Sequence, residues 1–236
     1  MQKLKKIGLI GGTGPESTLS YYKELNQRID KQTCGKEMPD IAIESVNFRK
    51  AWRYMESSDM VGLADYLAEK VTYLKNCGSE VISLTAVTMH VVLEEIEKKS
   101  GVKLVSIPKA VCEEVTKRGY KKVGLLGTIF TMEQDYMKKD LLEAGVEVCV
   151  PEKTDRDLIA KRILEELELG IVKESTLKEF QTIIEKMKKE QGIEAVILGC
   201  TELPLLLNND NCPVDCLDSV EIHIRKLIDM AMIDRR

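Results

Sequence analysis

Short apolar runs alternate along the chain with longer segments in which apolar residues recur at helical spacing. The apolar runs predict strands at 6–10, 41–46, 81–84, 104–107, 122–126, 147–150 and 196–198. The helical pattern covers 17–32, 60–76, 91–99, 109–118, 131–144, 155–169, 175–191 and 219–233. Because strands and helices alternate with short connections, the pattern predicts an α/β protein with parallel sheets flanked by helices.

An internal repeat divides this pattern into two halves. The segment KKIGLIGGTGPES begins at Lys5 and returns as KKVGLLGTIFTME at Lys121, an offset of 116 (121 − 5). The segment SEVISLT begins at Ser79, and its last residue aligns with the cysteine of EAVILGC at an offset of 115 (200 − 85). Two separate pairs with nearly the same offset indicate a duplication.

The duplication predicts two pseudo-symmetric lobes, and a chain of 236 residues is long enough for two small cores. We expect residues 1–103 with 210–236 to form the first lobe and residues 104–209 to form the second. Ligands of open α/β sheets bind at the carboxyl ends of the strands. We therefore expect the active site in the cleft between the two lobes.

Composition and charge narrow the class of protein. Hydrophobic residues make up 44% and charged residues 31% of the chain, which is typical of a globular protein. The net charge of −4 comes from interspersed lysines and glutamates, so a nucleic-acid partner is not expected. No stretch reaches the ~20 apolar residues of a membrane helix, and the first residues run directly into a strand pattern. We expect a cytoplasmic protein without a membrane partner.

Reactive side chains follow the apolar run at 196–198. The run ends at Gly199, and Cys200, Thr201 and Glu202 come next. A thiol near hydrogen-bond donors can act as an acid or a base, and a carboxylate can hold a substrate ammonium or orient its neighbours. The alternative is a buried core thiol with a capping glutamate. With two histidines and no C-x-x-C spacing among seven cysteines, a metal site is not expected.

Three motifs carry a resemblance to a known family. The segments IGLIGGTGPEST, LTAVTMH and VILGCTELPLLL resemble the aspartate/glutamate racemase family, and the resemblance covers essentially the whole chain. It implies two pseudo-symmetric α/β lobes with the substrate in the cleft, no pyridoxal phosphate or metal cofactor, and a homodimer. It also implies that one cysteine removes the α-proton of an amino acid and that a second cysteine returns a proton to the opposite face.

The first of those two cysteines is missing here. The family pattern is Cys-Asn-Thr-x-His, and anchoring it on Thr88 and His90 places Ala86 at the cysteine and Val87 at the asparagine. The repeat offset of 115 would instead align Cys200 with Thr85. A slip of one residue reverses the side of a strand that a side chain faces, so we keep the Thr-x-His anchor. Thr85 then lies beside the site, where its hydroxyl could relay a proton.

Other candidate residues would bind the substrate. The amides of Gly12 and Thr13 lie in a glycine-rich turn that suits a carboxylate, or that forms only a tight connection between strand and helix. Arg49 matches, by position, a family arginine thought to contact a substrate carboxylate, and Lys173 is a weaker candidate of the same kind. His90 could bind or reprotonate the substrate, or could be a hydrogen-bonded structural residue.

Three functions are compatible with these residues. The first is a racemase of aspartate or glutamate in which Cys200 is one acid/base group and a hydroxyl, a histidine or a held water is the second. The second is a single-thiol decarboxylase, isomerase or lyase of a dicarboxylate. The third is a non-catalytic protein that binds a small carboxylate. We take the racemase as the expectation, with a small amino acid or dicarboxylate as the substrate.

Overall fold

The computed structural model describes residues 4–232, and the chain divides into two compact units. The first unit extends to Ser106 and resumes at His223, while the second runs from Ile107 to Ile222. The sequence pattern predicts residues 210–236 in the first lobe. The structure draws this boundary later, because strand β7 (Asp215–Asp218) pairs with strand β6 (Ala195–Leu198) of the second unit.

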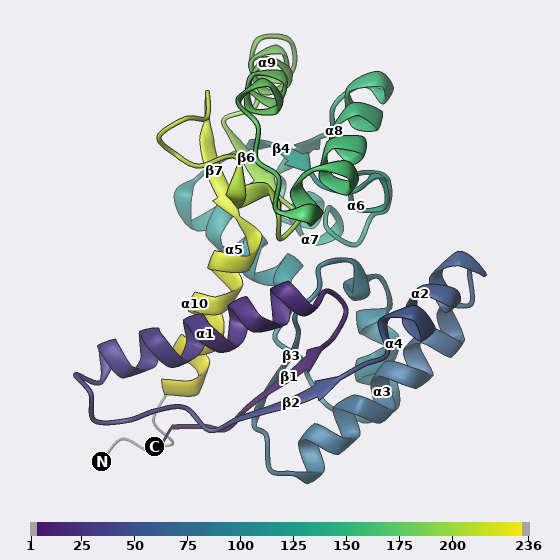
Figure 1. The fold of residues 1–236 in the computed structure, drawn as a ribbon, viewed down its shortest axis with the longest axis vertical. Coiled ribbons are helices and arrows are strands. Elements are labelled where there is room, and N and C mark those ends of the chain that lie inside the picture. Colours follow the sequence, from purple (N-terminus) through teal and green to yellow (C-terminus); the bar gives the residue numbers. More distant parts are fainter. Residues whose placement is uncertain (1–3, 233–236) are drawn as a thin grey trace. The chain divides into compact units, whose positions relative to one another are not determined.

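The first unit is built on a parallel sheet of three strands in the order β2-β1-β3 (Figure 1). Its strands are β1 (Ile7–Gly11), β2 (Ile41–Ser45) and β3 (Val81–Leu84). Its helical segments are α1 (Pro15–Gln32), α2 (Phe48–Glu56), α3 (Met60–Asn76), η1 (Thr88–Val92) and α4 (Leu93–Ser100). Every residue of β1 and β3 is buried, as in a parallel sheet covered on both faces, whereas the edge strand β2 is partly exposed.

The second unit is built on a parallel sheet of four strands in the order β5-β4-β6-β7. Besides β6 and β7, its strands are β4 (Lys122–Leu126) and β5 (Glu147–Cys149). Its helical segments are α5 (Ile107–Arg118), α6 (Ile129–Glu133), α7 (Lys139–Glu143), α8 (Lys153–Glu165), η2 (Leu167–Leu169), α9 (Glu174–Gln191) and η3 (Leu203–Leu205). Helix α10 (Ser219–Met232) begins in this unit and continues into the first. Two parallel sheets flanked by helices confirm the predicted fold class.

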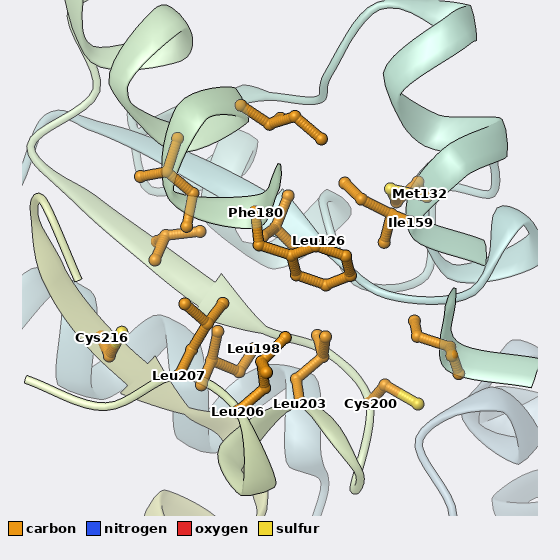
Figure 2. Close-up of a cluster of buried hydrophobic side chains, with 14 of the residues drawn as sticks. Leu126, Met132, Ile159, Phe180, Leu198, Cys200, Leu203, Leu206, Leu207 and Cys216 are labelled. Carbon is orange, nitrogen blue, oxygen red and sulfur yellow. The ribbon is translucent and has the colours of Figure 1, made fainter. Parts of the chain in front are cut away.

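An apolar cluster forms the core of the second unit (Figure 2). Phe180 of α9 and Leu126 of β4 are fully buried in it, and Leu198 of β6 is 1% exposed. Leu203, Leu206 and Leu207 bring the segment that follows β6 into the same cluster. The residues directly after β6 are therefore held against the core of their own unit.

Within each sheet the strands pair in equivalent registers, so the repeat in the sequence corresponds to a repeat in the structure. Ser83 of β3 forms a parallel bridge to Val105, and Ile197 of β6 pairs in the same way with Leu217 of β7. The strand expected at 104–107 is thus a single bridge, because Ile107 already begins α5. The fourth strand position exists in both units but forms a regular strand only in the second.

Other elements differ from the sequence-based expectation. The helix expected at 131–144 is two short helices, α6 and α7, because the backbone of Gln134 is extended and ends α6. Helix α2 and strand β7 were not expected, although Asn47 accepts a hydrogen bond from the Lys50 amide as an ordinary N-cap of α2. The expected end of the last helix, Ile233, lies outside the described residues. No helix within residues 4–232 is long and apolar enough to cross a membrane.

Candidate active site

Cys200 lies two residues after the end of β6, a strand that is buried at all of its positions. Gly199 is needed between them, because a Cβ atom there would meet the carbonyl oxygen of Leu126 at 2.9 Å. Figure 2 shows Cys200 at one margin of the apolar cluster, and the residue is 9% exposed. The fold therefore places this thiol where the core ends rather than deep inside it.

A carboxylate is positioned directly at the thiol. The Cys200 thiol donates a hydrogen bond to Oε2 of Glu202 at 2.9 Å, and the Thr201 hydroxyl donates to Oε1 of the same carboxylate at 2.6 Å. Both carboxylate oxygens are thus held by neighbours in sequence, which fixes the glutamate side chain over the thiol. Glu202 can accept the proton of Cys200 without any movement of the backbone.

The electrostatics of this site favour a protonated thiol. Burial raises the pKa of Cys200 well above its usual value, and the negative charges of Glu202 and Glu168 raise it further. Glu168 comes from η2, and the pKa of its own carboxyl group is raised by partial burial and by the charge of Glu202. Sequence reasoning missed Glu168, because only the fold brings it to the thiol. The second unit therefore carries an anionic pair beside a neutral Cys200.

The register of the strands identifies the counterpart of Cys200 in the first unit. Within the first sheet, the amide of Thr85 donates to the carbonyl of Ile10 at 3.1 Å. Within the second sheet, the amide of Gly199 donates to the carbonyl of Leu126 at 2.8 Å. Ile10 and Leu126 are equivalent by the repeat offset of 116 (126 − 10). Thr85 is therefore equivalent to Gly199, and the next residue, Ala86, is equivalent to Cys200.

The Thr85 side chain is used within the first unit. It is fully buried, and its hydroxyl donates to the carbonyl of Ile10 at 3.2 Å. The same hydroxyl lies 3.4 Å from that of Thr18, and the Ser17 hydroxyl donates to the Thr85 carbonyl at 2.8 Å. These bonds tie β3 to the start of α1. This observation gives the residue a structural role at the junction between strand and helix.

The segment after Thr85 carries the remaining motif residues. Ala86 and Val87 are buried, with exposed fractions of 8% and 5%, and Thr88, which begins η1, is half-buried. His90 Nδ1 donates to the carbonyls of Ala86 and Val87, at 3.0 and 3.2 Å. Burial lowers the pKa of His90 to about 4, so its imidazole is neutral near neutral pH. His90 thus closes the turn that follows β3.

The glycine-rich turn after β1 is tightly packed. The amide of Gly12 donates to the Thr18 hydroxyl at 3.0 Å, and that hydroxyl donates to the carbonyl of Gly14 at 3.2 Å. Gly12 has a φ of +82°, and a Cβ atom there would meet the carbonyl oxygen of Val46 at 2.5 Å. The neighbouring Thr13 is 9% exposed. The amide of Gly12 is therefore occupied within the turn, as in a tight connection between strand and helix.

The two basic candidates are placed differently. Arg49 is exposed near the start of α2. Lys173 precedes α9, and its Nζ lies 3.1 Å from Oε1 of the buried Glu166. That carboxylate also accepts hydrogen bonds from Arg162 and Thr176. Lys173 therefore takes part in the charge balance around Glu166, with its side chain 51% exposed.

The described part of the chain offers no grouped metal ligands. Within residues 4–232, no three histidine, cysteine, aspartate or glutamate side chains are arranged as a metal ion would require. The reactive groups around Cys200 are its thiol, the carboxyl groups of Glu202 and Glu168, and the Thr201 hydroxyl.

The chain is similar to known proteins over most of its length. Residues 10–227 match the family model described as Asp/Glu/Hydantoin racemase. A Yersinia pestis protein solved as a candidate Asp/Glu racemase is 36% identical, with a TM-score of 0.93 over 98% of this chain and 100% of that chain. An aspartate racemase homologue from Pyrococcus horikoshii is 41% identical, with a TM-score of 0.86 and the same coverage. The glutamate racemase of Actinobacillus pleuropneumoniae is 28% identical over 49% of this chain and 42% of its own length.

Proposed function

Because the chain belongs to the Asp/Glu/Hydantoin racemase family, we propose that it is a cofactor-independent racemase of aspartate or glutamate. Cys200 is one acid/base group, and an atypical group that is not a cysteine is the second. The observation that carries the proposal is the hydrogen bond from the Cys200 thiol to the Glu202 carboxylate. Inversion of an amino acid requires a proton donor or acceptor within reach of the α-carbon, and this pair provides one.

The anionic pair gives a reason for an amino-acid substrate. A substrate ammonium beside Glu202 and Glu168 would cancel the negative charge that raises the pKa of Cys200. Substrate binding would thereby make ionisation of the thiol easier, with Glu202 accepting the proton. The free protein keeps Cys200 protonated and unreactive, and the ammonium converts it into a competent base. We propose that the exposed Arg49 binds the substrate carboxylate.

Proton exchange in D₂O tests this proposal directly. We expect the purified protein to replace the α-proton of L-aspartate or L-glutamate with deuterium and to accumulate the D-enantiomer, as measured by NMR and chiral chromatography. Cys200→Ser should abolish the exchange, because a serine hydroxyl does not ionise near neutral pH. Cys34→Ser is the matched control, since Cys34 is an exposed thiol beyond the C-terminal end of α1, and this variant should catalyse exchange at the wild-type rate. Undiminished exchange in Cys200→Ser would remove this thiol from the mechanism.

A second candidate function follows from Ala86. Since the residue equivalent to Cys200 has no ionisable group, the protein could protonate one face of a carbanion only, as a decarboxylase, isomerase or lyase of a dicarboxylate does. Exchange without inversion would support this function and would contradict the racemase proposal. Ligand-induced thermal stabilisation without any exchange would instead indicate a carboxylate-binding protein.

Restoring the missing thiol separates the two catalytic functions. We expect Ala86→Cys to gain racemisation, because the strand register makes Ala86 the counterpart of Cys200. Thr85→Cys is the matched control, since Thr85 is equivalent to Gly199. An equal gain from Thr85→Cys alone would show that the register argument is wrong.

We also propose a homodimer, which sedimentation equilibrium would test.

A further inference from the structure

Two cysteines of the second unit lie on one short segment, away from Cys200. Cys212 ends the turn that precedes β7, and Cys216 is the second residue of that strand. Cys216 is 7% exposed and belongs to the apolar cluster, and Cys212 is half-buried and packs against it. Figure 2 shows Cys216 at the margin of the cluster opposite Cys200. The two pairs of reactive groups are therefore separate.

The backbone holds both cysteines to the same turn. The amide of Cys212 donates to the carbonyl of Asn208 at 3.0 Å, and the amide of Cys216 donates to Oδ1 of Asn209 at 2.7 Å. The turn itself is closed by the Asn208 amide, which donates to Oδ1 of Asn211 at 2.9 Å. Two consecutive asparagines thus fix the backbone positions of the two cysteines, and each sulfur lies close enough to change the pKa of the other.

We propose that Cys212 and Cys216 form a reversible redox site, in which Cys212 is the attacking thiol and Cys216 resolves the mixed disulfide. Disulfides require closely placed cysteines, and the shared turn supplies this placement. Redox-sensitive pairs combine an accessible thiol with a second thiol poised behind it. Cys212 is the more accessible member and Cys216 the buried member. The co-reactant is a low-molecular-weight disulfide such as oxidised glutathione.

The charges and donors around Cys212 suit the attacking role. The neighbouring Cys216 thiol and Val214 amide hold the pKa of Cys212 below its usual value. Lys188 adds positive charge, and its Nζ donates to the carbonyl of Pro213 at 3.0 Å. Asp215 acts in the opposite direction, although its carboxylate also accepts a hydrogen bond from Tyr120.

The environment of Cys216 suits the resolving role. Its pKa is raised by the neighbouring Cys212 sulfur and by burial, with smaller effects from Asp215 and Asp218. Once Cys212 has reacted, its sulfur carries no charge, and the largest cause of that rise is gone. Cys216 can then lose its proton at the moment when a nucleophile is needed.

The electrons and atoms of the two steps balance. The Cys212 thiolate attacks one sulfur of oxidised glutathione, the S–S bond of glutathione breaks, and one glutathione leaves as a thiolate that takes up a proton. The Cys216 thiolate then attacks the Cys212 sulfur and expels the second glutathione, which also takes up a proton. Two protein thiols are oxidised to one disulfide, and one glutathione disulfide is reduced to two thiols.

Peptide mass spectrometry after glutathione exchange tests the proposal on the full chain. The reduced protein is incubated with oxidised glutathione, quenched in acid and alkylated. We expect a Cys212–Cys216 disulfide, seen as a peptide lighter by about 2 Da than its reduced form. The exposed Cys34 serves as the internal control, and it should carry a glutathione that is not resolved. Recovery of Cys212 and Cys216 both alkylated, with Cys34 fully modified, would overturn the proposal.

Two variants establish the order of the steps. In Cys216→Ala, Cys212 should retain one bound glutathione, because no thiol is present to expel it. In Cys212→Ser, Cys216 should stay reduced, because it is buried. Modification of Cys216 in Cys212→Ser at the rate of the wild-type protein would contradict the assigned roles. The wild-type peptide map decides the main question even if a variant folds poorly.

Discussion

Two buried histidines make the first unit sensitive to acid. His223 is fully buried, its Nδ1 accepts a hydrogen bond from the Tyr21 hydroxyl at 2.7 Å, and its Nε2 donates to the carbonyl of Val105 at 3.0 Å. His90 is 4% exposed and donates from Nδ1 to backbone carbonyls. Both imidazoles are neutral in the folded protein, and the protonation states follow from these partners. Lowering the pH is the perturbation that tests them.

The size of the effect follows from the pKa values. Burial lowers the pKa of His90 to about 4 and that of His223 to about 3, from 6.5 in a solvated histidine. Below pH 6.5 the two histidines bind protons in the unfolded chain but stay neutral in the folded unit. The free energy of unfolding therefore falls as the pH falls. Each histidine costs about 2 kcal/mol between pH 7 and pH 5, or about 4 kcal/mol together. The loss continues down to pH 4 for His90 and pH 3 for His223.

Urea unfolding at pH 7, 6 and 5, followed by circular dichroism, measures this loss. The measurements stop at pH 5, because carboxylates such as Glu166, whose pKa is lowered, titrate only at more acidic pH. His223→Gln is the control, since it should lose about half of the pH dependence. The two histidines are the only ones in the chain, so their NMR signals can be followed directly. Equal unfolding free energies at pH 7 and 5, or imidazoles that titrate near pH 6.5, would refute the reasoning.

Two further predictions concern stability. Thr176→Val should destabilise the second unit by about 1–3 kcal/mol, because the buried Glu166 loses the Thr176 hydroxyl that donates to it at 2.5 Å; Thr182→Val, on the exposed side of the same helix, should change the urea midpoint little. Gly12→Ala should cost more than Gly35→Ala in a thermal melt, because both glycines have positive φ but only the added methyl at Gly12 meets a carbonyl oxygen at 2.5 Å. Equal costs within either pair would contradict the corresponding contact.

Many helices and strands could be predicted because the spacing of apolar residues along the chain shows which side of each element is buried. The strands β3 and β4 and the helix α3 begin and end where the apolar pattern places them. Strand β7 is not predicted by the apolar pattern, because two of its residues, Asp215 and Asp218, are polar. Its pairing with β6 determines its conformation. Tertiary pairing overrides weak local preference in such short strands.

Site residues that are close together in the sequence could be predicted, whereas residues that packing brings to the site could not. Cys200 and Glu202 could be identified because they are close in sequence and follow a buried strand. Glu168 could not, because its proximity to Glu202 depends on how η2 packs within the second unit. Lys173 looked similar to Arg49 in the sequence, yet the buried Glu166 engages it in an ion pair. Charge partners of this kind are set by three-dimensional packing.

Two different repeat offsets explain why a single offset gave the wrong counterpart for the end of β3. Leu84 and Leu198 pair with equivalent residues of their central strands, so the true offset at this strand is 114 (198 − 84), and the offset at the central strands is 116 (126 − 10). The segments between the paired strands therefore differ by two residues in length, and no single offset aligns both strands.

The register and the charges at Cys200 together limit how the chemistry can proceed. A thiol whose pKa is raised by burial and by two carboxylates waits in its protonated form, which is the form that donates a proton. Its counterpart by register, Ala86, can neither donate nor accept one. In the racemase that we propose, a reaction that uses both faces of an α-carbon therefore requires a second group that is not a cysteine. With the roles that we propose for Cys200 and Glu202, protonation of one face needs only these two residues, so inversion, rather than exchange, is the measurement that distinguishes the two proposed functions.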